Sequence, residues 1–320
     1  MPPTPSERPV VVTGGAGAIG AVLVRSLVDG GHPVRVIDNL SSGRREALGD
    51  LVDGKRVRLT VADLRSDPEV HREFDGAGSA WHLAANPDIR RGTEDPTLDL
   101  EHGTIATFRF LEAARRHDVP EVLFSSSSVV YGMPTVFPTP ESYGPLMPES
   151  LYGASKLASE GLFSAYAHTY GLRAYLFRFA NIIGAGMTHG VIFDFFEKLR
   201  RDPRRLEVLG DGRQSKSYLR TDDCVRGMRF AQAHARDAVN IFNLGTADRI
   251  GVDEIARRIV ALHGGTARID HTGGARGWKG DVPQQLLSIE KLSRLGWSPS
   301  SGSSEAVDLT LNEMARARGL

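Results

Sequence analysis

The chain has 320 residues, of which 41% are hydrophobic, so it can bury a substantial core and is long for one average domain. Basic and acidic residues number 39 each, so the formal net charge is zero and no overall field attracts a polyanion such as a nucleic acid. Cys224 is the only cysteine, which excludes an intrachain disulfide framework and a cysteine-rich metal site.

The start of the chain carries no targeting signal that the sequence reveals. Residues 1–9 are rich in proline and lack the apolar core of a signal peptide. No apolar run approaches the roughly 20 residues that a membrane-spanning helix needs. We therefore expect a cytoplasmic protein without a membrane partner, a nucleic-acid partner or a bound metal.

Short β-rich apolar runs alternate with amphipathic helical stretches through the first part of the chain. An alternation of this kind predicts an α/β fold with a parallel, doubly wound sheet of the Rossmann type. The expected elements, in chain order, are a strand at 10–12, a helix at 18–29, strands at 34–37, 57–61 and 80–83, a helix at 100–117, a strand at 122–125, a helix at 151–170 and a strand at 173–179.

The remainder of the chain has a different character. After Asn181 strands become sparse, and glycine, proline and charged residues become commoner, as in a smaller lobe that covers a substrate. No linker of distinct composition separates the two parts, so the chain should cross between them more than once. We expect one domain made of residues 1–182 and 216–247, and a smaller C-terminal lobe made of residues 183–215 and 248–320.

A glycine-rich turn directly follows the first expected strand. In TGGAGAIG (residues 13–20), Gly14, Gly17 and Gly20 stand three residues apart before the first helix. Glycine permits the tight turn and lets backbone N–H groups at the helix N-terminus approach a pyrophosphate. The second strand ends at Asp38, where a carboxylate would bind the diol of a ribose. The sequence therefore predicts a dinucleotide-binding site.

Asp38 also predicts which dinucleotide is bound. A carboxylate at this position repels the extra phosphate of NADP, so we expect NAD. Arg44 and Arg45 could bind such a phosphate, but a solvated surface role is the simpler interpretation of both.

Two further strand ends offer cofactor contacts. Asp63 ends the third strand and could accept a hydrogen bond from the adenine amino group. Leu83, Ala84 and Ala85 end the fourth strand and leave room where the dinucleotide passes close to the backbone.

A candidate acid–base group lies in YGASK (residues 152–156). Tyr152 and Lys156 are four residues apart, which places them on one face of a helix. A tyrosine with its reference pKa of about 10 is a poor base at neutral pH, but a nearby ammonium and an oxidised nicotinamide both favour the phenolate. Ser127 follows an expected strand at the ligand-binding edge of such sheets, and its hydroxyl could orient the same substrate oxygen. The three residues predict removal of a proton from a substrate hydroxyl.

These motifs together resemble the extended short-chain dehydrogenase/reductase family, and within it the NAD-dependent nucleotide-sugar epimerases and dehydratases. The stretch RGWKGDVP (residues 276–283) is similar especially to the UDP-galactose 4-epimerase-like branch. The resemblance covers nearly the whole chain. Besides the glycine turn and the Tyr152/Lys156 pair, it rests on DNLSSG (38–43), HLAA (82–85), VYG (130–132), RFAN (178–181) and GDG (210–212).

The resemblance implies NAD in the first domain, a UDP-hexose or UDP-N-acetylhexosamine in the smaller lobe, and a homodimer paired through helices 100–116 and 151–170. The cofactor contacts, including those derived above, are then Gly14, Gly17, Ala18, Ile19, Gly20, Asp38, Asn39, Ser41, Ser42, Gly43, Asp63, Leu64, Leu83, Ala84, Ala85, Tyr152, Lys156 and Ala180. The implied substrate contacts are Ser127, Ser128, Asn181, Val191, Gln214, Lys216, Tyr218 and Arg276, with Asp223 shaping the pocket.

Three positions depart from the family pattern. Lys216 stands where relatives commonly carry arginine, and it keeps the charge without the planar fork. Leu100 replaces an asparagine that usually precedes Gly103, which affects the local cofactor contacts. Nucleotide-sugar 4,6-dehydratases usually follow the catalytic hydroxyl with Asp-Glu, whereas this chain has Ser128 and Val129, and valine cannot exchange protons. This departure argues against an ordinary 4,6-dehydratase.

Three functions stay open from the sequence. The first is a UDP-hexose 4-epimerase that passes through a 4-keto sugar. The second is a UDP-GlcNAc 5,6-dehydratase of the tunicamycin-pathway kind, which begins with the same oxidation and then expels water. Ser128, Glu141 and Cys224 are its candidate groups for C5 and C6, although helix packing is the simpler interpretation of Cys224. The third is a non-catalytic nucleotide-sensing protein, against which the intact catalytic residues argue.

Overall fold

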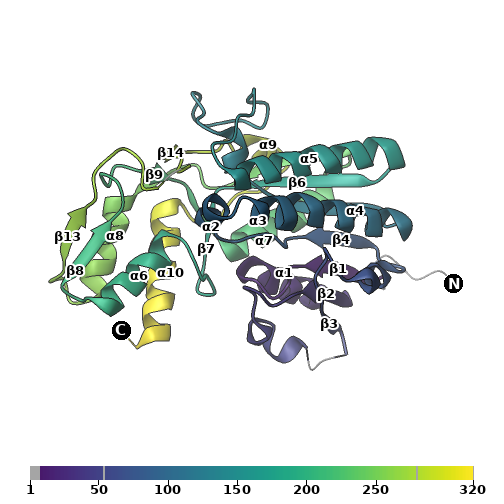
Figure 1. The fold of residues 1–320 in the computed structure, drawn as a ribbon, viewed down its shortest axis with the longest axis horizontal. Coiled ribbons are helices and arrows are strands. Elements are labelled where there is room, and N and C mark those ends of the chain that lie inside the picture. The colour runs from purple at the N-terminus through teal and green to yellow at the C-terminus, as the bar shows by residue number, and fades with distance from the viewer. Residues whose placement is uncertain (1–7, 53–54, 279, 320) are drawn as a thin grey trace. The chain divides into compact units, whose positions relative to one another are not determined.

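The computed structural model describes residues 8–52, 55–278 and 280–319, and the chain divides into two compact units (Figure 1). Unit 1 comprises Met1–Val130, Leu151–Arg178 and Met228–Phe242, and unit 2 comprises Tyr131–Ser150, Phe179–Gly227 and Asn243–Leu320. The proline-rich start up to residue 7 and Lys279 of the RGWKGDVP stretch lie outside the described residues. The segments that group with unit 2, although we expected them in the first domain, are 131–150, 179–182, 216–227 and 243–247.

Unit 1 is built on a seven-stranded sheet with the strand order β11-β6-β5-β4-β1-β2-β3. Thr13 pairs with Ile37 on one side and with His82 on the other, both in parallel, so β1, β2 and β4 end level with one another. The expected parallel, doubly wound sheet is confirmed. Its strands are β1 (Val10–Thr13), β2 (Val34–Asp38), β3 (Val57–Val61), β4 (Ser79–His82), β5 (Glu121–Ser127), β6 (Arg173–Phe179) and β11 (Val239–Leu244).

The strand order reverses beside β1, and this reversal fixes where the helices and the ligand edge lie. The connection from β1 to β2 runs one way across the sheet, and those from β4 to β5 and from β5 to β6 run the other way. The right-handed crossover rule therefore places α1 (Ala18–Asp29) on one face and α4 (Ala106–Arg116) and α5 (Leu151–Tyr170) on the other. Sheets of this kind bind ligands at the carboxyl ends of the strands next to the reversal.

The face of the sheet under α4 and α5 carries an aromatic core. α4 packs against α5, and both run along the sheet (Figure 1). The ring of Phe163 lies 5.0 Å from that of Phe124 in β5 and 5.9 Å from that of Phe110 in α4, measured between centroids. All three side chains are at most 2% exposed. Their burial fixes α5 against the end of β5, since each fully buried phenylalanine contributes about 1.5–3 kcal/mol.

The expected helix over residues 100–117 is observed in two parts. A π-helix, η4 (Leu100–Ile105), precedes α4 and turns more widely than an α-helix. The other short helices of unit 1 are η1 (Arg45–Ala47), η2 (Gly49–Leu51), η3 (Pro68–Phe74), α2 (Ile89–Glu94) and α3 (Thr97–Asp99), while η5 (Ser128–Tyr131) follows β5.

Unit 2 has its own core, in which α6, α8 and α10 pack around Phe195, Phe196, Ile255, Leu311 and Met314. Its strands are short, which agrees with the sparse strand pattern of this part of the sequence. They are β7 (Asn181–Ile183), β8 (Arg205–Val208), β9 (Ser215–Lys216), β10 (Tyr218–Arg220), β12 (Ile250–Gly251), β13 (Arg268–His271) and β14 (Gln284–Gln285). Its helices are α6 (Val191–Arg201), α8 (Val252–Leu262), α9 (Glu290–Arg294) and α10 (Ser303–Arg318), and α7 (Thr221–His234) belongs partly to each unit.

Apolar side chains are exposed on the helices that we expect to pair two copies of the chain. Leu100, Phe108 and Tyr170, on η4, α4 and α5, are 53%, 39% and 52% exposed. These exposed side chains are consistent with the homodimer, which stays a proposal in which they become buried.

In the described part of the chain, no helix combines the length and apolar character needed to cross a membrane.

Replacing Phe108 by arginine should convert the dimer to a monomer, because a guanidinium would be desolvated in an apolar interface without a partner. Light scattering at micromolar concentration measures the change. The matched control is Leu309→Arg, which alters an apolar side chain of similar exposure on α10 and should leave the mass unchanged. A wild-type chain that runs as a monomer would contradict the proposal.

Candidate active site

The first two turns of α5 hold Tyr152 and Lys156 against the end of β5. Lys156 is 2% exposed and donates from Nζ to the carbonyl oxygen of Ser125 at 2.7 Å. Its Nζ lies 4.7 Å from the ring centroid of Phe124 and 5.5 Å from that of Tyr152. Ser127 lies two residues beyond Ser125 on the same strand, and its Oγ accepts a long hydrogen bond of 3.4 Å from the Val129 backbone. The predicted catalytic residues therefore stand on two adjoining elements of unit 1.

Burial changes the proton affinity of both α5 residues. Burial lowers the pKa of Lys156 to about 7, and the negative charges of Asp99 and Glu160 oppose that change. Burial, followed by the charge of Asp99, raises the pKa of Tyr152 well above its usual range. The chain alone therefore does not favour the expected phenolate, because desolvation outweighs the nearby ammonium.

A buried ion pair ties α5 to β6. Arg178 donates from Nε and Nη2 to the two carboxylate oxygens of Glu160 at 2.9 and 2.7 Å, and Ser126 donates to the same carboxylate at 2.5 Å. The charged side chains are 4% and 6% exposed. Glu160 is a further residue of this site that no sequence motif marks, although its spacing of four residues from Lys156 places both on one face of α5.

His82 of the HLAA motif has a structural place. Its ring is fully buried, with Nδ1 2.7 Å from Thr13 Oγ1 and Nε2 3.1 Å from Thr107 Oγ1. Burial, assisted by repulsion from Lys156, lowers its pKa to about 3. The neutral imidazole joins β1 to α4 and is not a proton acceptor for catalysis at neutral pH.

The glycine turn after β1 fits a dinucleotide. Gly14 has a φ of +70°, and a Cβ at this position would lie 2.6 Å from the backbone nitrogen of Ala84. A Cβ at Gly20 would clash with the carbonyl oxygen of Gly14. At Gly17, the N-cap of α1, a Cβ would meet only that carbonyl, at 3.3 Å. The N–H groups of Ala18 and its successors in the first turn are therefore open to a pyrophosphate.

Asp38 is fixed beside this turn. Its two carboxylate oxygens accept hydrogen bonds of 2.9 Å from the backbone nitrogens of Ala16 and Leu40. A Cβ at Gly43 would lie 3.0 Å from Asp38 Oδ1, so the segment 38–43 closes tightly against the carboxylate. A carboxylate at the end of β2 beside the glycine turn fits a dinucleotide, and its contact with a ribose diol stays a prediction.

Asp63 is more heavily hydrogen-bonded than the sequence suggested. Its carboxylate accepts Arg65 Nε at 3.0 Å, Arg65 Nη2 at 2.8 Å and Asn39 Nδ2 at 3.2 Å. The hydrogen bonds from Arg65 hold the pKa of Asp63 well below its usual range. The Asp63 carboxylate already accepts these hydrogen bonds, and an adenine amino group would add another donor. The contact between Asp63 and adenine stays a prediction.

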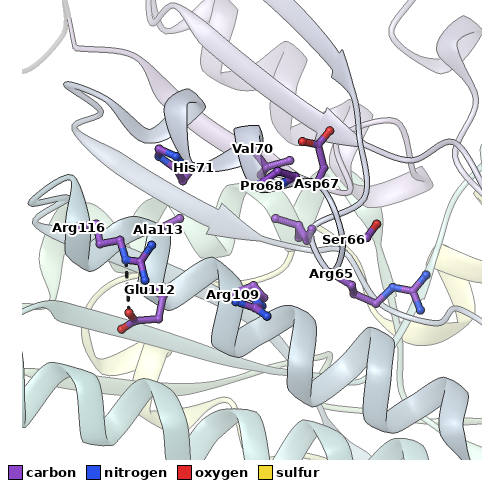
Figure 2. A pocket seen from close by; sticks show the side chains of 11 residues that line it. Arg65, Ser66, Asp67, Pro68, Val70, His71, Arg109, Glu112, Ala113 and Arg116 are labelled. Carbon is purple, nitrogen blue, oxygen red and sulfur yellow. Dashed lines mark ion pairs between the residues drawn. The ribbon is translucent and has the colours of Figure 1, made fainter.

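A hollow of about 370 Å³ lies beside η3 and α4 (Figure 2). Leu64 is the one predicted site residue that lines it. Its arginines are largely paired: Arg65 binds Asp63, and Arg116 Nε lies 3.6 Å from Glu112. None of the predicted catalytic residues, Ser127, Tyr152 and Lys156, is among the residues that line this hollow.

The effect of Leu100 on the local cofactor contacts, which the family pattern implied, stays a prediction. The Leu100 side chain is 53% exposed at the start of η4. Gly103 instead faces α5, where a Cβ would clash with Ser155 Oγ. The wide turn of the π-helix changes which residue faces the fold, a shift that a regular helical periodicity does not predict.

Unit 2 holds most of the predicted substrate residues, and there Lys216 has a fixed partner. Its Nζ donates to Asp281 Oδ1 at 2.6 Å, and the other carboxylate oxygen accepts the backbone nitrogen of Gly277 at 3.0 Å. The Asp281 side chain is 4% exposed. Lys216 thus anchors the stretch 276–283 to β9.

Gln214 and Arg276 meet at Gly210, whose φ is +83°. A Cβ at Gly210 would clash with Gln214 Nε2 and would lie 3.1 Å from the carbonyl oxygen of Arg276. Gln214 is 3% exposed, and its Oε1 has no hydrogen-bond partner within the described chain. The Arg276 guanidinium is half-exposed and pairs with Glu149 at 3.1 Å. A buried acceptor without a partner fits a site that is completed by a polar ligand.

The other predicted residues of unit 2 are more enclosed. Asn181 donates from Nδ2 to the Ser217 carbonyl at 3.0 Å, and Val191 opens α6. Ala180 and Tyr218 are 8% and 3% exposed. Of the candidate C5/C6 groups, Glu141 accepts the Asn243 backbone nitrogen at 2.8 Å, whereas Cys224 is fully buried, in agreement with a packing role.

Replacing Arg178 by methionine should lower the free energy of unfolding by about 3–5 kcal/mol, because Glu160 would stay buried without its partner. Denaturant titration with a conserved m value measures the loss. The double variant R178M/E160M removes both charges and should recover much of the stability. Equal losses in the single and double variants would contradict this role of the pair.

Comparisons with known proteins agree with this arrangement. The family described as the NAD dependent epimerase/dehydratase family matches residues 10–245. The chain is 31% identical over 314 residues to the UDP-glucose 4-epimerase of Mycolicibacterium smegmatis, which covers 94% of this chain and 96% of the relative. A crystal structure of a UDP-galactose 4-epimerase has a TM-score of 0.87 at 39% identity, covering 97% of this chain and 99% of that one. The Thermus thermophilus UDP-glucose 4-epimerase in complex with NAD has a TM-score of 0.85 at 30% identity, with coverages of 96% and 99%.

These matches decide between an enzyme and a non-catalytic sensor. They agree with the glycine turn, the fixed Asp38 and the Tyr152/Lys156 pair. A non-catalytic sensor is set aside, since the relatives are enzymes. The chain belongs to the NAD-dependent epimerase/dehydratase family and is an NAD-dependent enzyme of the isomerase or lyase kind that acts on nucleotide sugars.

Proposed function

We propose that the enzyme is a UDP-hexose 4-epimerase that inverts C4 through a transient 4-keto sugar. The observation that carries the proposal is the placement of Tyr152 and Lys156 in unit 1, at the carboxyl edge of the sheet that also bears the glycine turn. This shared edge supports the proposal, because hydride exchange between a dinucleotide and a hydroxyl-bearing carbon requires a proton acceptor nearby. The names of the relatives support epimerisation at C4.

Tyr152 removes the proton of the C4 hydroxyl while the C4–H bond breaks, and it returns the proton when C4 is reduced from the opposite face. NAD, when bound, would supply the hydride acceptor and donor for this reaction. Lys156 stabilises the developing phenolate from 5.5 Å below the ring centre. Ser127 orients the C4 oxygen by donating its hydroxyl proton. No net redox change results, because the hydride returns to the carbon that it left.

The nucleotide diphosphate is assigned to residues of unit 2. Arg276 is half-exposed and its ion pair with Glu149 is partly exposed, so exchange of that partner for a phosphate costs little free energy. Lys216 is only 19% exposed and is engaged with Asp281. We therefore give Arg276 the main charge contact and Lys216 a positioning role, in keeping with the fork geometry that suits arginine to phosphate.

Tyr152→Phe keeps the ring and removes the acid–base group, so kcat should fall by about 10² to 10⁴ while folding and NAD binding are retained. Turnover of UDP-glucose to UDP-galactose measures the effect. Tyr170→Phe, at an exposed tyrosine of the same helix, is the control and should keep wild-type activity. Full activity in Tyr152→Phe would remove the catalytic assignment.

Reaction in D₂O separates 4-epimerisation from 5,6-dehydration. Epimerisation conserves mass and leaves C5 unlabelled, because that hydrogen is never removed. Elimination takes the C5 hydrogen as a proton and loses water. Mass spectrometry and proton NMR of the product from UDP-glucose and from UDP-GlcNAc should show equal mass and no C5 deuterium. Loss of water from either sugar would replace the proposed reaction by the dehydratase.

Asp38→Ala should weaken NAD binding and narrow the preference for NAD over NADP, since a carboxylate that repels the extra phosphate disappears. Calorimetric titration with each dinucleotide gives the two affinities. Asp50→Ala, at an exposed acid of η2 that pairs with Arg25, serves as control. An unchanged ratio of affinities would show that Asp38 does not contact the ribose.

A further inference from the structure

Asp99 is a buried carboxylate to which neither the sequence nor the resemblance gives a role. It ends α3 and is 2% exposed. Oδ1 accepts a hydrogen bond of 3.0 Å from Asn86 Nδ2, and Oδ2 has no hydrogen-bond partner among the described residues. A buried polar atom left without a partner costs roughly 1–3 kcal/mol, and more when it is charged. A nearby positive charge would stabilise a buried carboxylate at this position.

The surrounding backbone makes room for this carboxylate. A Cβ at Gly92 in α2 would clash with Asp99 Oδ2. Asn86 is itself held in place, since its Oδ1 accepts the Asp88 backbone nitrogen at 3.1 Å. The carboxylate therefore occupies a fitted position between α2 and the segment that follows β4.

That position borders the catalytic helix. α3 packs against α5 and η4, and Gly103 of η4 lies against Ser155, one residue before Lys156. Asp99 interacts electrostatically with both Lys156 and Tyr152. It is the larger of the two negative influences on Lys156; the other is Glu160.

Glu160 is a weak counter-charge for Lys156 because it is already neutralised. Arg178 binds both of its oxygens, and Ser126 donates to one of them. Within the part of the chain that the structure describes, Lys156 has the Ser125 carbonyl as its acceptor and the rings of Phe124 and Tyr152 beside it, and none of these carries a negative charge. Burial of an ammonium in these surroundings favours the neutral amine unless a free negative charge lies near.

We propose that Asp99 is the counter-charge that keeps Lys156 an ammonium ion in its buried position, and that Asp99 thereby acts on the reaction through Lys156 and Tyr152. It is a positioning residue, since its carboxylate is enclosed by α2 and does not reach a substrate. The effect on turnover rests on the proposed function, whereas the effect on Lys156 does not.

The histidines near Asp99 and Lys156 carry little charge, so they do not replace Asp99 and Lys156 as partners for each other. His102 of η4 faces it, but burial lowers the pKa of His102, so this ring carries little charge at neutral pH. His82 faces Lys156 from β4 and is neutral as well. Burial raises the pKa of Asp99, and the Asn86 hydrogen bond and the Lys156 charge both oppose this change. Asp99 and Lys156 therefore stabilise each other's charged forms.

The sign of the effect follows from these contacts. The negative charge of Asp99 raises the pKa of both Lys156 and Tyr152. In Asp99→Asn the pKa of Lys156 should fall, so the pH at which kcat changes with loss of the Lys156 ammonium should move to a lower value. A loss of packing alone would lower the rate at every pH and leave that value unchanged.

The direct test is an NMR titration of the Lys156 side chain in the full chain, with ¹³C-labelled lysine. The chain has six lysines, so the signal can be assigned with Lys156→Arg as reference. In Asp99→Asn the titration midpoint should fall by about one pH unit or more. Glu94→Gln removes an exposed charge from the end of α2 and should leave the midpoint unchanged. An unmoved midpoint in a folded Asp99→Asn chain overturns the proposal.

Asn86→Ala gives a second route if Asp99→Asn does not fold. Losing the Asn86 donor destabilises the charged carboxylate, so the Lys156 midpoint should fall here as well, by less than in Asp99→Asn. No movement in Asn86→Ala would count against the proposal. The NMR result is independent of the sugar: a shifted midpoint in an enzyme that turns out to dehydrate its substrate would keep Asp99 in this role and remove only the 4-epimerase assignment.

Discussion

Burial of the Lys156 ammonium between β5 and α5 is the constraint on which the rest of the active unit depends. Tyr152 can hold negative charge only if a cation stays close, and desolvation works against that cation. The Ser125 carbonyl accepts a hydrogen bond from the ammonium, and two aromatic rings lie beside it. The negative charges of Asp99 and Glu160 also stabilise it. Glu160 is neutralised by Arg178, and this ion pair joins α5 to β6. Asp99 of α3 is then the proposed counter-charge for Lys156.

The same sheet edge brings hydride and proton chemistry together. β1, β2 and β4 end level, and their last residues lead into the glycine turn, Asp38 and the HLAA segment. β5 ends beside them with its serines, and the aromatic core under α5 fixes the helix that carries Tyr152. The glycine turn, Asp38 and Ser127 therefore owe their places to strand register, whereas Tyr152 and Lys156 owe theirs to the packing of α5.

Patterns local in sequence predicted much of this arrangement. The alternation of strands and helices gave the doubly wound sheet, and the spacing of Tyr152 from Lys156 put them on one helical face. Contacts that depend on tertiary placement were not accessible in this way. The partner of Glu160 is on another strand, Asp63 is occupied by Arg65, and Asp99 is buried only because α2 offers a glycine opposite it. The π-helix also altered which residue faces α5, and no periodicity rule anticipates that change.

In the proposed reaction C4 is oxidised and then reduced, Tyr152 accepts and returns the proton, and the hydride returns to the same carbon. UDP-glucose deuterated at C4 tests it most directly, in a reaction followed by proton NMR in ordinary water. The account predicts UDP-galactose with the deuterium retained at C4, because a hydride held on the bound cofactor does not exchange with solvent. Replacement of that deuterium by solvent hydrogen would show that C4 loses its hydrogen as a proton, and would contradict the account.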